Sequence, residues 1–253
     1  MDKSKITAWY YRNSIWIVVF IFIIECLLFA TRWGNVYEFP GSDPEVAYVL
    51  NSLLIIEGES PCHIDHPGTT MQMLGAFVYT GVYWLKLSFN GQIGSIVEDV
   101  IRNPKIYIMA QRLLLILLVN IGLLVFLKKS SRYFRNKEFS LAILVFLIFT
   151  PIISGSSAIS AQPVLIISSF LFTGLFIQLS FTKSNLSLGH VAIFAIAIGV
   201  GTASKLVFLT LVPFLLIIPK MKVKNLLQLT ARSCLIFIIF TIPIFGNSIA
   251  TYS

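Results

Sequence analysis

Residues 69–88, TTMQMLGAFVYTGVYWLKLS, decide how many times this chain crosses a membrane. A helix of about 20 residues is long enough to cross a hydrocarbon core of about 30 Å. However, Thr, Gln, Gly and Lys side chains interrupt the apolar residues of this segment. The segment is therefore either a transmembrane helix or a helix in the membrane interface, and the rest of the chain decides between them.

Composition predicts that the solvent of this chain is largely lipid. The 253 residues are 57% hydrophobic and only 12% charged, and their mean hydropathy is +0.85. Such a chain cannot bury its apolar surface in one water-soluble core, so we expect an all-α integral membrane domain over residues 1–253. The net charge of +8 does not indicate nucleic acid, because basic residues at the ends of membrane helices set their orientation.

Seven apolar runs are candidates for transmembrane helices. They cover residues 14–30, 105–127, 139–157, 162–181, 189–203, 205–219 and 226–246. Most are long enough to cross the hydrocarbon core as α-helices. The run at 189–203 is short and rich in glycine, so we expect its outer end to be irregular or to lie in a cavity lined by protein.

The distribution of Lys and Arg places residues 69–88 in the interface. If this segment crossed the membrane, the basic segments 128–137 and 220–224 would face the side opposite to the basic N-terminal tail. If it lies in the interface, all three face the cytoplasm. We therefore predict a multi-pass protein of the cell membrane with seven spans, a cytoplasmic N-terminus and an external C-terminus.

This topology makes residues 31–104 one long external loop, followed by the remaining transmembrane helices at 105–246. The loop holds eight of the eleven acidic residues. Within it, residues 41–55, GSDPEVAYVLNSLLI, predict a short interfacial helix, because Ser42 and Glu45 fit a capping box. The side chains that we expect on its lipid-facing apolar face are Val46, Val49, Leu50 and Leu53.

The same loop contains residues 61–73, PCHIDHPGTTMQM, in which Pro67 and Gly68 predict a turn. Moving a sugar from a lipid phosphate to a hydroxyl requires a carboxylate that takes the hydroxyl proton or stabilises the oxocarbenium-like centre. It also requires cations that stabilise the leaving phosphate. The candidate carboxylates are Asp43, Glu45 and Asp65, and the candidate cations are His63, His66, Arg112 and Lys205.

These groups also have purely structural interpretations. Asp43 can cap the following helix, while Asp65 and His66 can be solvated turn residues. Arg112 can extend to the outer headgroups or contact a phosphate. Lys205 lies between two apolar runs, where a cation usually has a partner such as a lipid phosphate. The His-x-Asp-His spacing supports a divalent metal only weakly, so we predict no metal site and no cofactor.

Four short motifs follow one another along the chain. They are GSDPEVAY (41–48), DHPGTT (65–70), MAQRLL (109–114) and GTASKLVFLTLVP (201–213). With one span before a long external loop, this order resembles the GT-C superfamily of glycosyltransferases, which use polyprenyl-phosphate sugars. Protein O-mannosyltransferases and aminoarabinose transferases belong to it. The resemblance covers nearly the whole chain as an order of elements, although each motif is short.

The resemblance implies roles for particular residues. Asp43 matches the catalytic carboxylate of the superfamily, and residues 65–67 match a stretch of an acid, a Lys or His, and prolines. The predicted substrate-binding residues are Glu45, Tyr48, Asp65, His66, Arg112 and Lys205. The chain departs from the pattern at Gly68, where a second proline is usual, and at Gln162, where an acid often opens the fourth span.

The leading hypothesis is a glycosyltransferase that moves a sugar from a polyprenyl-phosphate donor to an unknown lipid, glycan or protein acceptor at the external face. Two alternatives remain open. One is a transporter or flippase-like protein for lipid-linked sugars, and the other is a truncated, non-catalytic or partner-dependent subunit with the same membrane module. A transporter is expected to show repeated halves, and no internal repeat is visible in the sequence.

Overall fold

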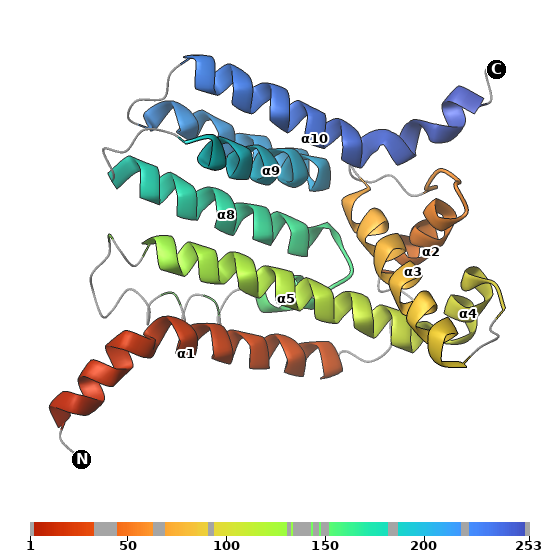
Figure 1. Cartoon of the computed structure of the whole chain (residues 1–253), viewed down its shortest axis with the longest axis horizontal. Helices are drawn as coiled ribbons and strands as arrows, with labels where there is room; N and C mark the ends of the chain where they lie inside the picture. Colours follow the sequence, from red (N-terminus) through yellow and green to blue (C-terminus); the bar gives the residue numbers. More distant parts are fainter. Residues whose placement is uncertain are drawn as a thin grey trace.

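A computed structural model gives the fold, and every regular element among its described residues is a helix. The structure describes residues 3–32, 45–62, 69–90, 94–130, 133, 143, 147, 152–181, 187–218 and 223–250. Four long helices with apolar spans run roughly parallel to one another (Figure 1), and they are α1 (Lys3–Arg32), α5 (Pro104–Ser130), α8 (Ala161–Phe181) and α10 (Val223–Ala250).

These four helices contain stretches that are long and apolar enough to cross a membrane. The stretches are Asn13–Thr31, Pro104–Ser130, Ala161–Phe181 and Val223–Ile244. Their outward faces are apolar as well, because Leu113, Leu117 and Ile121 follow one another at helical spacing on α5 and are each about half exposed. A water-soluble helix would carry polar residues on such a face. The expected class of α-helical membrane protein is therefore confirmed.

The predicted number of seven spans is not confirmed. The four stretches correspond to the predicted runs at 14–30, 105–127, 162–181 and 226–246. The run at 139–157 falls mostly outside the described residues. Its described part is residues 143 and 147 and the short helix α7 (Ile152–Ser157). The runs at 189–203 and 205–219 form shorter helices, α9 (Leu188–Ser204) and the 3₁₀-helix η2 (Leu206–Ile217).

Helices α9 and η2 have similar lengths in space despite their different residue counts. The 17 residues of α9 extend about 25 Å at 1.5 Å per residue. The 12 residues of η2 extend about 24 Å, because a 3₁₀-helix rises about 2.0 Å per residue. Both connect at Lys205, whose extended backbone, with φ −153° and ψ 129°, separates them.

The glycines of α9 serve close packing rather than irregular backbone. Of the two alternatives for the outer end of this run, irregular backbone is wrong, because α9 remains helical to Ser204. The other is confirmed, because Gly199 and Thr202 line a cavity of about 310 Å³. A Cβ atom on Gly199 would lie 2.7 Å from the side chain of Ile236 on α10. A Cβ atom on Gly201 would lie 2.7 Å from the ring of Phe208 on η2. Both glycines therefore allow α10 and η2 to approach α9 more closely than any larger residue would.

Residues of the predicted external loop form three helices that gather at one end of the long helices (Figure 1). They are α2 (Glu45–Ile56), α3 (Thr70–Asn90) and α4 (Ile96–Arg102). Helices α2 and α3 match the two predicted interfacial segments closely, whereas α4 lies in a part of the loop for which no helix is predicted above. The carboxyl end of α5, with Lys128 and Lys129, lies at the opposite end of the molecule.

The apolar face of α2 packs partly on protein. Val49 and Leu53 are buried in a cluster with residues of α3 and α5, whereas Val46 and Leu50 are about half exposed. All four side chains line a cavity of about 370 Å³ that α4 and α5 complete. The expectation that this face rests on lipid is therefore wrong for Val49 and Leu53, because α3 and α5 cover them.

Candidate functional site

The structure describes only part of the predicted site. Asp43, Asp65 and His66 lie outside the described residues. Glu45 is the first residue of α2. The placement of Tyr48, Arg112 and Lys205, and the residues on either side of the 63–68 turn, define the surroundings that the structure gives to the site.

Cys62 and Thr69, the described residues that flank residues 63–68 in the sequence, each bond to a different helix. On its N-terminal side, the backbone N–H of Cys62 donates to Oδ1 of the buried Asn51 on α2 at 3.1 Å. On its C-terminal side, the backbone N–H and the hydroxyl of Thr69 both donate to the carbonyl oxygen of Phe240 on α10, at 3.0 and 2.8 Å. Cys62 is therefore held on α2 and Thr69 on α10.

Thr70, the first residue of α3, connects this region to α9. Its hydroxyl lies 2.9 Å from the hydroxyl of Ser204, and both side chains are buried. The Ser204 hydroxyl also donates to the carbonyl oxygen of Val200 at 2.9 Å, so Thr70 can donate to Ser204 in turn. Lys205 follows Ser204 directly, which brings the end of the 65–70 motif next to the α9–η2 junction.

Lys205 occupies the position that the apolar runs predicted. It is half-buried and lies between α9 and η2. Its backbone N–H donates to the carbonyl oxygen of Gly201 at 2.9 Å, and its own carbonyl oxygen accepts from Phe208 at 3.0 Å. These two bonds hold the backbone of Lys205 between the two helices.

Arg112 is buried instead of extending to the headgroups. Only 4% of the residue is exposed, and Nη1 donates to the carbonyl oxygen of Ala30 at 3.3 Å. The carbonyl groups in the last turn of α1 carry partial negative charge, so a guanidinium group is favourable there. The interpretation that Arg112 extends to the outer headgroups is therefore wrong, and the structure shows it joining α5 to the end of α1.

Tyr48 belongs to the interior between α2, α3 and α5. It is 4% exposed and lies in an apolar cluster that also contains Met71, Tyr79 and Tyr107. The carbonyl oxygen of Tyr48 accepts a hydrogen bond from the hydroxyl of Ser52 at 2.7 Å. The side chain of Tyr48 thus supports the packing under α2, while a role in substrate binding stays a prediction.

The structure brings together a polar cluster that the sequence analysis missed. Lys86 on α3 donates to both carboxylate oxygens of Asp99 on α4, at 2.7 and 2.5 Å. The same carboxylate accepts from Nδ2 of Asn103 at 2.9 Å and from the hydroxyl of Tyr107 on α5. Lys86 also lies 5.4 Å from the centre of the Tyr107 ring. We call Lys86, Asp99, Asn103 and Tyr107 the α3–α5 cluster.

The hydrogen bonds of this cluster set the charge of Asp99. Burial alone would raise the pKa of its carboxyl group, but hydrogen bonds from Lys86, Tyr107 and Asn103 outweigh burial and hold the pKa below its ordinary value of 3.8. Asp99 is therefore ionised at neutral pH and paired with Lys86. Because every partner comes from α3, α4 or α5, the cluster holds these helices together.

A second pair of side chains continues this link along α3. The hydroxyl of Tyr79 donates to Oε1 of Gln111 at 2.5 Å, and Nε2 of Gln111 donates to the carbonyl oxygen of Met71 at 3.4 Å. Tyr79 and Gln111 are fully buried. Met71 directly follows Thr70, so these bonds fix the first turn of α3 on α5.

An apolar cavity of about 360 Å³ lies beside the first turns of α3. It is lined by Thr70, Met73, Leu74 and Phe77 of α3 and by apolar residues of α5, α8, α9 and α10. The cavity therefore adjoins the anchored end of the 65–70 motif. Within the ranges that the structure describes, no three His, Cys, Asp or Glu side chains come together as metal ligands.

No protein-family model, curated protein or solved structure matches the chain significantly. The resemblance to the GT-C superfamily therefore rests on the sequence motifs and their order alone.

Proposed function

We propose that the chain is a membrane glycosyltransferase that moves a sugar from a polyprenyl-phosphate donor to an acceptor hydroxyl at the external face. The observation that carries this proposal is the 2.9 Å contact between Thr70 and Ser204. It joins the 65–70 motif, with its carboxylate and imidazole, to the residue before Lys205. Asp65 and His66 precede Thr70 by five and four residues in the sequence, which supports a site that they share with Lys205.

The proposed reaction uses these groups in separate roles. Asp43, two residues before α2 in the sequence, accepts the proton of the acceptor hydroxyl as that oxygen bonds to the sugar C1. The bond between C1 and the phosphate oxygen breaks, and the oxygen leaves with the electron pair. Protonated His66 and Lys205 stabilise the charge that develops on the leaving phosphate. Asp65 and Glu45 bind hydroxyl groups of the substrates.

The apolar cavity beside Thr70 supports a lipid-linked donor. Its volume of about 360 Å³ and its apolar lining suit the first part of a polyprenyl chain, whose phosphate would then lie near Lys205. A water-soluble sugar nucleotide would not use such a lining. The donor would approach from the bilayer, with its phosphate at interface depth.

Charge distribution supports an external site and a cytoplasmic N-terminus. Lys128 and Lys129 lie in the last turn of α5 and Lys224 lies in the first turn of α10, and both helix ends lie away from α2, α3 and α4 (Figure 1). The acidic residues Glu57 and Asp99 belong to the end that carries the proposed site. Basic residues concentrate on the cytoplasmic side of membrane proteins, so the site would face outward.

The experiment that tests this function uses the full chain in lipid nanodiscs. Polyprenyl-phosphate sugars with a radiolabelled sugar are added, and release of polyprenyl phosphate is followed together with transfer of the label. Release above that of empty nanodiscs supports the proposal. Donor binding without release would indicate a non-catalytic subunit, and movement of intact donor across vesicles containing the chain would indicate a transporter.

A further inference from the structure

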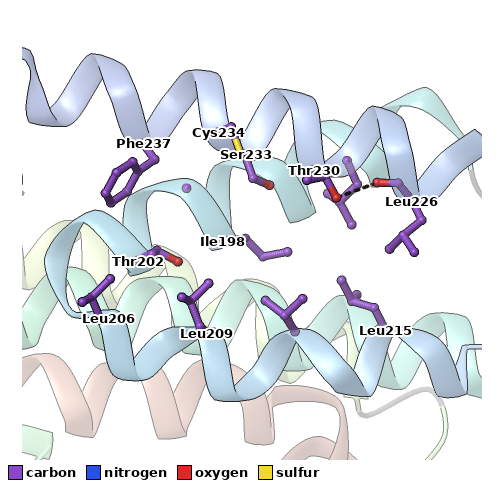
Figure 2. Close-up of a pocket in the computed structure, with 13 residues that line it drawn as sticks. Ile198, Thr202, Leu206, Leu209, Leu215, Leu226, Thr230, Ser233, Cys234 and Phe237 are labelled. Carbon is purple, nitrogen blue, oxygen red and sulfur yellow. Dashed lines mark hydrogen bonds between the residues drawn. The ribbon is translucent and has the colours of Figure 1, made fainter. Parts of the chain in front are cut away.

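A third apolar cavity begins beside Lys205 and follows a groove between α9, η2 and α10 (Figure 2). Its volume is about 310 Å³, within the range of about 300–1,000 Å³ that small-molecule sites span. Most of its lining is aliphatic or aromatic, including Leu206, Leu209, Leu215, Leu226 and Phe237. The groove lies among helices whose outward faces are apolar, so its surroundings supply lipid rather than water.

Two buried hydroxyl groups interrupt this apolar lining. Thr202 on α9 and Ser233 on α10 are each 7% exposed, and neither hydroxyl has a hydrogen-bond partner within the described part of the chain. Thr230, in the same groove, differs because its hydroxyl donates to the carbonyl oxygen of Leu226 at 3.0 Å. Figure 2 shows the oxygen atoms of Thr202 and Ser233 directed into the space between α10 and η2.

An unpartnered buried hydroxyl is unfavourable, and a bound group that accepts a hydrogen bond removes this cost. A ligand that fits this groove is therefore mostly apolar, and it carries hydrogen-bond acceptor atoms at one point along its length, where they meet the two hydroxyls. A plain hydrocarbon or polyprenyl chain has no acceptor atom and leaves both hydroxyls unpaired. An ester-linked acyl chain has an ester carbonyl followed by a long apolar chain.

The position of the hydroxyls along the groove fits this chemistry. Thr202 lies two residues before the end of α9, and a Cβ atom on Gly199 would lie 2.8 Å from the carbonyl oxygen of Ser233. Both hydroxyls therefore lie within about two turns of the end of α9 that leads to Lys205. Leu215 and Leu226 line the groove toward the opposite end of α9 (Figure 2).

We propose that this groove binds one acyl chain of a membrane glycerolipid. The ester oxygen atoms accept hydrogen bonds from Thr202 and Ser233, the headgroup lies toward the Lys205 end, and the chain follows the leucines of η2 and α10. In a bilayer, ester groups lie just below the headgroups, which matches hydroxyls near a helix end. This inference stands without the proposed transferase function, because it uses none of the predicted catalytic residues.

The test uses the full chain in detergent with a diester phospholipid that carries a diazirine near the middle of one acyl chain. After illumination, crosslinks are mapped by mass spectrometry. We expect labelling of η2 and α10 in the groove, with the exposed face of α5 at Leu113, Leu117 and Ile121 as the reference for ordinary lipid contact. Three unlabelled competitors are compared: the diester lipid, its diether analogue with the same chains, and polyprenyl phosphate.

The concentration of diester lipid that halves the groove label should be about fivefold lower than that of the diether analogue. This ratio corresponds to roughly one net hydrogen bond. In the double variant Thr202→Val/Ser233→Ala this preference should disappear. The matched control is Thr210→Val, because the hydroxyl of Thr210 is exposed and donates to its own helix at Val207. Leu209→Trp should block the groove and remove its label while the α5 label remains.

Three results would overturn the proposal. One is equal displacement by diester and diether lipids in the wild-type chain. Another is a groove label that resembles the α5 label and persists in Leu209→Trp, which would indicate ordinary lipid contact only. The third is stronger displacement by polyprenyl phosphate than by the diester lipid. Melting temperatures of all variants are measured in the same detergent to identify any that fail to fold. If Leu209→Trp fails to fold, Leu209→Phe replaces it.

Discussion

The hydroxyl of Thr70 lies 2.9 Å from the hydroxyl of Ser204, so two residues 134 positions apart in the sequence meet in the interior. Thr70 ends the DHPGTT motif and begins α3, whereas Ser204 ends α9. The contact therefore fixes the helix that follows the proposed donor-binding turn on the helix that leads to Lys205. Any movement of α3 away from α9 would separate the two halves of the proposed site.

This contact can be tested with Thr70→Val and Ser204→Ala. Each substitution should lower the free energy of unfolding by about 1 kcal/mol, because each removes the buried hydrogen bond between the two hydroxyls. The double variant should lose less than the sum, since both changes remove one bond. Thermal unfolding in detergent measures the effect. Strictly additive losses would show that the two hydroxyls act independently.

Asp43→Asn should abolish sugar transfer while leaving the melting temperature nearly unchanged. The amide keeps the shape of the side chain but cannot accept the proton of the acceptor hydroxyl. Transfer of radiolabelled sugar, measured beside the melting temperature, separates activity from folding. Glu98→Gln is the matched control, because the side chain of Glu98 is 47% exposed and pairs with Arg102 on the next turn of the same helix. Near-normal turnover of Asp43→Asn would reduce Asp43 to a helix cap.

His66 and Lys205 should act on the same donor phosphate. His66→Ala and Lys205→Ala should each weaken donor binding, and the double variant should lose less than the sum because both groups contact one phosphate. Imidazole must be protonated for this role, and its ordinary pKa is about 6.5. Binding should therefore fall as the pH rises through that region, and this fall should be absent in His66→Ala. Calorimetric titration with a polyprenyl-phosphate analogue at two pH values tests both statements.

The sequence predicts the long helices better than it predicts their contacts. Runs of Leu, Ile, Val and Phe locate α1, α5, α8 and α10 because a bilayer requires about 20 apolar residues for each crossing. The same logic does not show that residues 206–217 form a 3₁₀-helix, because a continuous apolar run does not distinguish a 3₁₀-helix from an α-helix. The sequence also does not reveal that Arg112 is buried against the end of α1. Its partner at Ala30 lies 82 positions away, and no local pattern reports it.

The α3–α5 cluster could be found only in part from the sequence. Ser95 and Glu98 form the pattern that begins a helix, and Ser95 accepts from the backbone N–H of Glu98 at 3.2 Å. This pattern predicts α4, although not that Asp99 would face Lys86. The pairing depends on how α4 folds back on α3, which is a property of tertiary structure. The predicted site, in contrast, is inferred from the order of short motifs along the chain, which the sequence shows directly.

Asp99→Asn should destabilise the chain by about 2–3 kcal/mol near neutral pH, because it leaves Lys86 partly buried without its carboxylate. The pH dependence has a definite sign. Since the folded pKa of Asp99 is below 3.8, its stabilisation is complete above the unfolded pKa and is lost as the pH falls through the folded pKa. Melting temperatures from pH 7 to pH 3 should therefore fall more steeply for the wild-type chain than for Asp99→Asn.

The control for this prediction is the exposed pair of Glu98 and Arg102. Their side chains are 47% and 73% exposed, so Arg102→Gln should change the free energy of unfolding by less than about 0.5 kcal/mol. Equal losses in Arg102→Gln and Asp99→Asn would contradict the role of Asp99 in joining α3, α4 and α5.

Cysteine labelling tests the predicted orientation. In a background without the native cysteines, single cysteines at Ser131 and Lys222 should be shielded from a membrane-impermeant thiol reagent in intact cells, because basic segments stay in the cytoplasm. A cysteine at Ser95, the N-cap of α4, should be labelled. Permeabilised cells supply the control, since all three positions should then react. Labelling of Ser131 in intact cells would invert the orientation.

The hairpin of α9 and η2 is about 5 Å shorter than a hydrocarbon core of about 30 Å. Such hydrophobic mismatch draws the headgroups of neighbouring lipids inward, and the bilayer beside the hairpin would become thinner. Lys205, at the turn of the hairpin, would then need only its four methylene groups to bring its ammonium group to the level of a phosphate. A thicker bilayer would bury the same ammonium group, so lipid chain length would control whether Lys205 can hold an anionic lipid.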